Sequence, residues 1–176
     1  LTPSNERELR EVLRCVARDD LAALPVGSAT KLPFADAPAR LDVLISTHAM
    51  RQVIAFEPGD GTLTAQAGAR LSALAELAQS GGRDLVPRYA ESTQATLGGA
   101  IATGEMGSDR LRRGALREHV LGLRVMLSDG TTSRSGGRLV KNVAGYDLHR
   151  LHTGAWGGLG LILEAISLTK NPSLQQ

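Results

Sequence analysis

Hydrophobic residues in the first third of the chain follow a helical and then an extended pattern. Apolar residues recur between positions 9 and 16 at the spacing of one helix face, and Pro3 stands where a first helical turn accepts proline. These signals predict a helix over residues 3–18. Three short, continuous apolar runs follow, and such runs favour strands that are buried on both faces; they span residues 21–26, 41–45 and 53–56.

Two turn signals dominate the remainder of the chain. Asp60-Gly61 separates residues 53–57 from residues 62–67, and Asp129-Gly130 follows a strict alternation of apolar and polar residues over 121–127. Both dipeptides favour tight turns, so each predicts a β-hairpin. The other periodic segments predict helices over residues 70–79, 96–103 and 145–152, a short extended piece over 85–87, and a final strand over 159–168.

The order of these elements indicates the fold class. Helices and strands are mixed without the regular alternation of a doubly wound sheet, which favours an α+β fold. We expect a small N-terminal subdomain over residues 1–58 and a larger subdomain over residues 59–170 that contains the antiparallel hairpins. Residues 171–176 form a tail without a pattern.

The overall composition excludes several classes of protein. The chain has 176 residues, of which 42% are hydrophobic and 22% charged, as in an ordinary soluble domain. A net charge of +2 and an aromatic content of 3% argue against nucleic-acid binding. No apolar run approaches the roughly 20 residues of a membrane-spanning helix, and no signal peptide is recognisable. We therefore expect a cytoplasmic protein, with any membrane association peripheral and through partners.

Cysteine and histidine usage limits the chemistry. Cys15 is the only cysteine, so the chain alone can form neither an internal disulfide nor a cysteine-ligated zinc or iron–sulfur site. Its place beside the apolar stripe of the first helix favours simple packing. His149 and His152 are three residues apart on a predicted helix without a zinc motif, so we expect a solvated helix face there. His48 and His119 are isolated, and we predict no metal site.

Glycine is the unusual component of the sequence. There are 20 glycines, and most lie between Gly98 and Gly160. Glycine accumulates where the backbone turns sharply or where a ligand must approach bare backbone. No G-x-G-x-x-G, P-loop or G-x-S-x-G string accompanies it, which removes the usual signatures of Rossmann, P-loop and α/β-hydrolase proteins.

Two segments have the character of cradles for a phosphate group. Residues 25–32 leave a predicted strand and enter a turn of small residues, whose backbone N–H groups could converge on an anion; an ordinary turn is the alternative. Residues 95–104 contain a helix start at Thr96 followed by Gly98 and Gly99. This start would offer unbonded N–H groups and a positive dipole end, with tight packing as the alternative. Both segments in one chain favour a bound cofactor.

Arginine is concentrated in one short segment that contains Arg110, Arg112, Arg113 and Arg117. A solvated loop is the simplest interpretation. The alternative is a contact with an anion or a partner protein, because guanidinium groups bind carboxylates and phosphates in a forked geometry. We therefore take this cluster as a candidate docking surface.

The most specific string in the chain runs from Arg134 to Leu148, R-S-G-G-R-L-V-K-N-V-A-G-Y-D-L, and a glycine-rich stretch follows it as far as Ile162. Arg113-Gly114 and residues 120–122 also match. On these strings the chain resembles FAD-binding domains of the PCMH type, the vanillyl-alcohol-oxidase family. Within that family it is most similar to the small FAD-binding subunit of bacterial glycolate oxidase, along nearly its whole length.

The resemblance implies a fold of two α+β subdomains with FAD between them. The histidine and cysteine that anchor FAD in covalent members have no counterpart here, so FAD would be noncovalent. Residues 26–32 match the pyrophosphate loop, and the other matching segments include one near the flavin and a final strand that passes the cofactor. The implied cofactor-binding residues are Gly27, Ser28, Ala29, Thr30, Lys31, Pro87, Thr96, Leu97, Gly98, Gly99, Ala102, Thr103, Gly104, Gly107, Gly160 and Ile162.

The same resemblance implies an activity and partners. Family members are oxidases and dehydrogenases that take hydride from alcohols or 2-hydroxy acids, so we expect a component of a glycolate-type 2-hydroxy-acid oxidase or dehydrogenase. The implied partners are a larger flavoprotein subunit and an iron–sulfur subunit. The substrate side of the family's active site lies in a cap domain, to which no segment here can be assigned. We therefore expect no catalytic residue in this chain and no activity of the chain alone.

Four residues depart from the family pattern. Ser28 and Ala29 stand where glycine is usual, and alanine resists a positive φ. Glu105 and Met106 are bulkier than the usual small residues, and Glu105 would place a negative charge near an anionic cofactor. These departures favour an alternative function, a cofactor-free interaction subunit that retains the fold.

Overall fold

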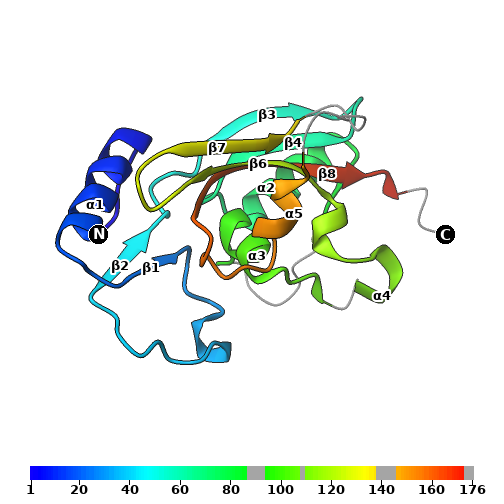
Figure 1. The fold of residues 1–176 in the computed structure, drawn as a ribbon. Helices are drawn as coiled ribbons and strands as arrows, with labels where there is room; N and C mark the ends of the chain where they lie inside the picture. Colours follow the sequence, from blue (N-terminus) through cyan, green and yellow to red (C-terminus); the bar gives the residue numbers. More distant parts are fainter. Residues whose placement is uncertain (87–93, 108–109, 138–145, 173–176) are drawn as a thin grey trace.

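The computed structural model describes residues 1–86, 94–107, 110–137 and 146–172. Within these ranges the chain forms a two-stranded sheet and a six-stranded sheet together with several helices, which confirms the α+β class. Figure 1 shows the small sheet and the first helix at one end of the molecule, with the large sheet extending away from them.

The first helix, α1 (Glu6–Arg18), begins later than predicted. Its N-cap is Asn5, whose side chain accepts a hydrogen bond from the N–H of Glu8, so the chain before residue 5 is not helical. Leu9 and Leu13 are buried, as the helical spacing predicted. Cys15 is exposed, so the expectation that it packs in the core is wrong. It lies two residues beyond Leu13, which places it on the opposite side of the helix.

Strands β1 (Ala23–Val26) and β2 (Val43–Ser46) pair in parallel, and the 3-10 helix η1 (Leu32–Phe34) lies in the connection between them. The prediction that these strands are buried on both faces is wrong. Ile45 is buried in a cluster with α1, whereas Leu24 and Leu44 line an outer groove. The two strands are therefore covered on one face, and that face turns toward the rest of the molecule.

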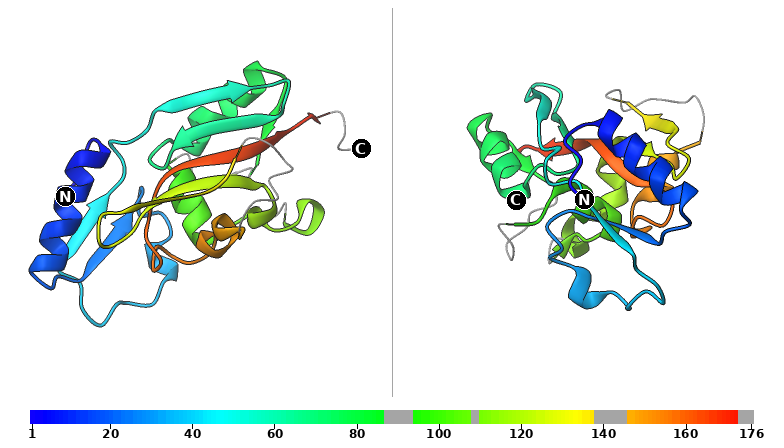
Figure 2. Two further views of the ribbon diagram at one scale, coloured as in Figure 1. Left: turned by 45° about the horizontal axis from the view of Figure 1, so that its top comes forward. Right: turned by 90° about the vertical axis from the view of Figure 1, so that its left-hand side faces the viewer.

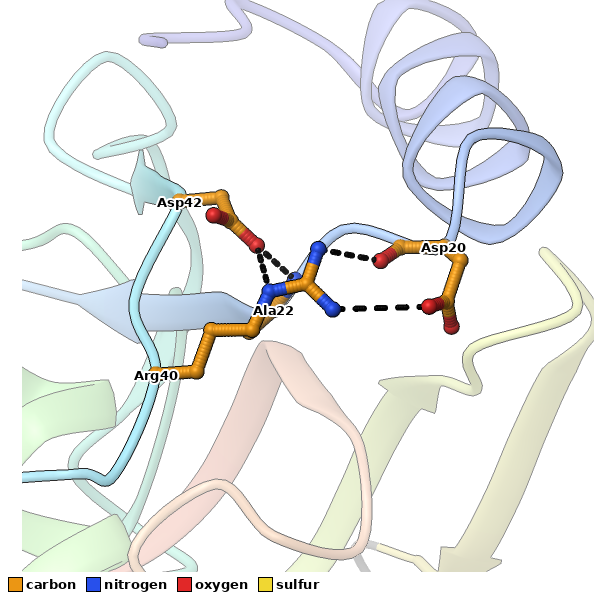
Figure 3. Close-up of polar contacts among 4 residues, drawn as sticks. All are labelled: Asp20, Ala22, Arg40 and Asp42. Atoms are coloured by element: carbon orange, nitrogen blue, oxygen red, sulfur yellow. Dashed lines mark hydrogen bonds and ion pairs between the residues drawn. The ribbon is translucent and has the colours of Figure 1, made fainter.

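Arg40 ties the segment that precedes β2 to the segment that precedes β1 (Figure 3). Its Nε atom lies 2.7 Å from Oδ2 of Asp42, and its Nη2 atom donates to the carbonyl oxygen of Asp20 at 2.8 Å. The same Asp42 oxygen accepts the N–H of Ala22 at 2.8 Å. These contacts are largely exposed, so they contribute little to stability. They do fix where β1 starts, and hence the place of the loop that follows it.

The large sheet has the order β3-β4-β8-β6-β7, and every pair is antiparallel. Both predicted hairpins are confirmed, since β3–β4 turns at Asp60-Gly61 and β6–β7 turns at Asp129-Gly130. A short strand, β5, pairs with the C-terminal end of β8, where Leu85 lies opposite Thr169. The strands are β3 (Val53–Glu57), β4 (Thr62–Gln66), β5 (Asp84–Leu85), β6 (Val120–Met126), β7 (Thr132–Gly136) and β8 (Leu161–Lys170).

Helices α2 (Leu71–Ser80) and α3 (Leu97–Thr103) pack on this sheet and form the main core with it. Leu74 and Ile101 are fully buried there against residues of β4, β6 and β8. The other helical segments of the described chain are shorter, and α5 lies beside β6 and β7. They are α4 (Arg110–Arg113), the 3-10 helix η3 (Leu116–Glu118) and α5 (Leu148–His152).

A second core cluster joins the two parts of the molecule, since Leu9 of α1 and Ile45 of β2 pack with Met126 of β6 and with the start of β8. Figure 2 shows the same arrangement from two further directions, with α1 across the end of the sheet. A subdomain boundary at residue 58 would fall inside the β3–β4 hairpin. We propose instead that the boundary lies in the connection between β2 and β3, over residues 47–52.

Candidate functional site

The loop that follows β1 presents backbone donors that no protein group occupies. In the described part of the chain, the N–H groups of Gly27, Ser28, Ala29 and Thr30 make no hydrogen bond. Ala29 has a left-handed backbone with a φ of 57°, so alanine accommodates the conformation that its side chain disfavours. Such a reversal within a turn directs neighbouring N–H groups toward one concavity, where they can bind an anion.

The hydroxyl of Ser28 also indicates that this loop binds an anion. Its Oγ atom is buried and has no hydrogen-bond partner. A buried polar atom is normally paired, because leaving it unpaired costs about 1–3 kcal/mol. A buried hydroxyl beside several unpaired N–H groups is therefore a binding surface for an anion with several oxygen acceptors.

Gly27 holds this loop against the start of α3. A Cβ atom at residue 27 would lie 2.0 Å from Oγ1 of Thr96, which is closer than any side chain can approach. Thr96 is the N-cap of α3 and is almost fully buried. Glycine at residue 27 thus brings the donor loop into contact with the helix that forms the opposite wall of the site.

The start of α3 does not supply donors of its own. The N–H groups of Leu97 and Gly98 donate to the carbonyls of Ala69 and Ala67 at 2.9 and 2.8 Å, and the N–H of Gly99 donates to Thr96 Oγ1 at 3.2 Å. The expectation that this helix start offers unbonded N–H groups is therefore wrong, because the segment after β4 uses them. Gly98 serves packing, since a Cβ there would lie 2.6 Å from Cβ of Ala67.

Two adjoining hollows lie between the loop and α3. The larger encloses about 560 Å³, its open mouth included, and is bordered by residues 24–32 and one side of α3. The smaller encloses about 360 Å³ and reaches the start of β8. Both hollows share the residues Pro25, Val26, Gly27, Gly99, Ala102 and Trp156. Together they form one continuous candidate site whose walls carry mostly small or apolar side chains.

Most of the cofactor residues implied by the sequence line these hollows. Leu97 does not, because it is buried in the main core. Gly104 and Gly107 line neither hollow; both have a left-handed backbone, and Gly104 ends α3. Pro87 lies outside the described residues, as do residues 138–145 of the diagnostic string. The lining residues are Gly27, Ser28, Ala29, Thr30, Lys31, Thr96, Gly98, Gly99, Ala102, Thr103, Gly160 and Ile162.

Several lining residues escaped the sequence analysis, among them Thr47, Ala67 and Trp156. Thr47 carries no local signal, since it reaches the site only through the pairing of β1 with β2. Trp156 did carry one. It is a large aromatic residue inside the glycine-rich run at 154–160, where small residues would be expected.

Lys31 and Glu105 form an ion pair at the edge of the larger hollow. The Nζ atom of Lys31 lies 2.7 Å from the Glu105 carboxylate and 5.5 Å from the centre of the Phe34 ring. The negative charge of Glu105 is thus balanced by the lysine, so it does not stand alone beside the site as the sequence suggested. Met106 is fully buried in the main core and lines neither hollow.

The histidines lie away from the site, since none of the four lines either hollow. His149 is buried, so the expected solvated face is wrong there: its backbone N–H and its Nδ1 atom each lie 3.2 Å from Oγ of Ser135 on β7. His119 is also buried, with Nε2 at 2.7 Å from the carbonyl oxygen of Arg113. Burial lowers the pKa of both His119 and His149.

The arginine cluster is only partly a surface. Arg113 is buried and its Nη2 atom lies 3.8 Å from Oδ2 of Asp84, so this residue does not belong to a docking face. The sequence could not show this, because Asp84 comes from a strand far away in the chain. The candidate docking surface is reduced to Arg110, Arg112 and Arg117, which are exposed.

Two other features, a metal site and a membrane-spanning helix, are absent from the described residues. Nowhere in them do three or more His, Cys, Asp or Glu side chains gather as they would around a metal ion. None of the helices in the described ranges has the length and apolar character needed to cross a bilayer.

Known proteins resemble this chain in sequence and in fold. Glycolate oxidase subunit GlcD of Bacillus subtilis is 32% identical over 166 residues, which cover 94% of this chain and 35% of that protein. The mitochondrial D-2-hydroxyglutarate dehydrogenase of Bos taurus is 35% identical over 172 residues, which cover 98% of this chain and 31% of the relative. The chain therefore spans about a third of the length of these relatives.

A solved structure of alkyldihydroxyacetonephosphate synthase matches with a TM-score of 0.79 over 97% of this chain and 33% of that one, at 22% identity, which shows a shared fold. The family model described as "FAD binding domain" matches residues 1–136. These matches confirm the resemblance that the sequence strings indicated. The chain belongs to the FAD-binding domain family of PCMH-type flavoproteins, and its cofactor is FAD.

Proposed function

We propose that this chain is the FAD-binding domain of a flavin-dependent oxidase or dehydrogenase of 2-hydroxy acids. The relatives are named for glycolate oxidase and for D-2-hydroxyglutarate dehydrogenase, and both of those substrates are 2-hydroxy acids. The observation that carries the proposal is the donor loop, in which the N–H groups of residues 27–30 and the Ser28 hydroxyl have no partner in the described chain.

The residues of the site fit FAD. The pyrophosphate group carries several oxygen acceptors, and it would accept hydrogen bonds from the donor loop, with Lys31 adding positive charge nearby. Gly99 and Ala102 line both hollows and have at most a methyl side chain, so a planar ring can approach the wall of α3 closely. Among the described residues that line the hollows there is neither a cysteine nor a histidine that could anchor FAD covalently. We therefore propose noncovalent binding.

When bound, FAD supplies a two-electron acceptor for the hydride of the substrate's α-carbon. The reaction further needs a base for the hydroxyl proton and a positive group for the carboxylate. Among the described residues that line the hollows, Lys31 is the only ionisable side chain, and it is paired with Glu105. The described residues thus offer a site for the cofactor but no base, and we propose that the base comes from another part of the enzyme.

Flavin binding and turnover test this proposal separately. The purified chain should take up FAD from an excess and keep its absorbance after gel filtration. The loaded chain should oxidise neither glycolate nor D-2-hydroxyglutarate with a dye acceptor faster than free FAD does. A chain that stays colourless would overturn the binding site, whereas rapid turnover would show that the chain carries its own base.

A cofactor-free interaction subunit is the second candidate, and one observation favours it. Lys31 is already ion-paired with Glu105, and the N–H groups at the start of α3 already donate within the protein. Of the two predicted phosphate cradles, only the loop after β1 therefore offers unbonded donors. FAD titration of the wild type beside a Glu105→Ala, Ala29→Gly double variant separates the candidates. If neither protein binds, the interaction subunit gains support. If only the variant binds, the scaffold is competent and these residues exclude the cofactor.

We further propose that the electrons leave this domain to a separate iron–sulfur protein, within an assembly that includes a larger flavoprotein subunit. The relative GlcD is named as a subunit, and this chain has a single cysteine, too few for a cluster of its own. Charge reversal of Arg112 and Arg117 should abolish co-purification of the iron–sulfur partner. Arg51→Glu, at an exposed arginine outside the cluster, is the control. Unchanged co-purification would remove the cluster as the docking surface.

A further inference from the structure

Trp156 is the only tryptophan in the chain, and it lies where the two hollows meet. It belongs to the turn between α5 and β8. The backbone N–H of Trp156 donates to the carbonyl of Ala102 at 2.8 Å, and the backbone N–H of Gly154 donates to the carbonyl of Ile101 at 2.9 Å. These bonds attach the turn to α3, so the fold itself sets where Trp156 stands relative to the site.

The backbone of Trp156 is left-handed, with a φ of 53°. A side chain makes this conformation unfavourable, and the other left-handed positions of the same turn, Gly154, Gly157 and Gly160, are glycines. A bulky residue in this conformation is uncommon, and strain of this kind clusters at ligand sites. The strain alone identifies no ligand. The kind of ligand follows from the surroundings of the indole.

The indole is a large apolar group beside open space. The Trp156 residue is 43% exposed, and it borders both hollows together with Gly99 and Ala102 of α3. Because these two neighbours are small, a flat group has room beside the indole. The arrangement suits a planar aromatic ring, since such rings stack on tryptophan and gain affinity from the contact.

FAD carries two planar rings, isoalloxazine and adenine, on the two sides of its pyrophosphate. We propose that Trp156 is a cofactor-contacting residue whose indole stacks on one of these rings. The inference rests on the proposed FAD site and adds to it a wall that the sequence resemblance did not include. A tryptophan at this position thereby has a role that offsets its unfavourable backbone.

FAD dissociation constants of single variants test the contact. Trp156→Ala should weaken FAD binding roughly 10-fold, and Trp156→Phe, which retains a ring, roughly 3-fold or less. Leu159→Ala is the matched control, because Leu159 is 45% exposed in the same turn and lines neither hollow. Its FAD affinity should equal that of the wild type. Thermal unfolding of each protein without FAD should show similar midpoints, which separates a lost contact from a lost fold.

Titration with ADP and with FMN identifies the ring. The ligand whose affinity falls with that of FAD in the Trp156→Ala protein carries the stacked ring. If Trp156→Ala binds FAD as tightly as the wild type does, or if Trp156→Phe is as weak as Trp156→Ala, the inference is overturned while the proposed function stands. A wild-type protein that binds no FAD overturns the proposed function together with the inference.

Discussion

The loop at residues 27–30 packs against the helix start at residues 97–99 where Gly27 meets Thr96. The backbone N–H groups of the two segments differ in whether they are hydrogen-bonded. In the described chain the loop donors have no partner, whereas the helix donors bond to Ala67, Ala69 and Thr96. Both segments contain glycine for close approach, Gly27 to Thr96 and Gly98 to Ala67. Small residues at a turn therefore do not by themselves indicate a ligand site; the decisive property is whether another part of the chain already uses the donors.

The largest effect should come from Gly27→Val. Its side chain would collide with Thr96 and displace the donor loop, so FAD binding should weaken at least about 100-fold, or roughly 2.7 kcal/mol. The main core does not include this loop, so the thermal midpoint should change little. Gly59→Val is the control, because a Cβ there meets nothing within 4 Å. Wild-type FAD affinity in the Gly27→Val protein would contradict the placement of the cofactor.

Gly98→Ala should instead reduce stability. The added methyl would press against Ala67 inside the core, and overpacking of this kind costs about 1–3 kcal/mol in the free energy of unfolding. Gly99→Ala is the matched variant one residue on, where the new Cβ would meet only Thr96 Oγ1 at 3.0 Å. Thermal unfolding should show a clear loss for Gly98→Ala and a smaller one for Gly99→Ala. Equal losses would contradict the different roles of the two glycines.

A smaller effect is expected from Glu105→Gln. The substitution removes a negative charge near the anionic cofactor and releases Lys31, so FAD should bind roughly 2- to 5-fold more tightly at low salt. The gain should shrink as the ionic strength rises. Glu57→Gln, at an exposed site on β3, serves as the control. Weaker binding by Glu105→Gln would mean that the ion pair holds Lys31 in the position that FAD needs.

The smallest effect concerns pH and residues outside the site. Burial lowers the pKa of His119 and His149, so the unfolded chain binds more protons than the folded one once the pH falls below about 6.5. The stability that the two neutral imidazoles contribute is present above that pH and is lost as the pH falls toward their folded pKa values. Urea unfolding between pH 7 and about pH 5 should show this loss, and His149→Gln should reduce it. A pH-independent stability would contradict the burial of these rings.

Local signals predicted much of the fold. The Asp-Gly dipeptides placed both hairpins, and apolar spacing placed α1 and α2, because these features depend on neighbouring residues only. The resemblance and the small residues at 27–31 also located the donor loop. The partners of buried polar groups could not be predicted, since Arg113 meets Asp84 and His149 meets Ser135 through the tertiary fold alone.

The same limit explains the incorrect prediction for α3. Its N-cap at Thr96 was recognisable from the sequence and is confirmed. The sequence does not reveal that the carbonyls of Ala67 and Ala69, just after β4, accept hydrogen bonds from the first turn of this helix. Likewise, nothing local showed that Ala29 and Trp156 take left-handed conformations, because only surrounding contacts enforce them.

Amide hydrogen exchange, followed by NMR with and without FAD, tests the central claim most directly. Without FAD, the amides of residues 27–30 should exchange rapidly, while those of residues 97–99 should already be protected by their bonds within the protein. Saturation with FAD should slow exchange in the loop and leave the helix start nearly unchanged. Protection that appears at residues 97–99 while the loop still exchanges freely would contradict the account.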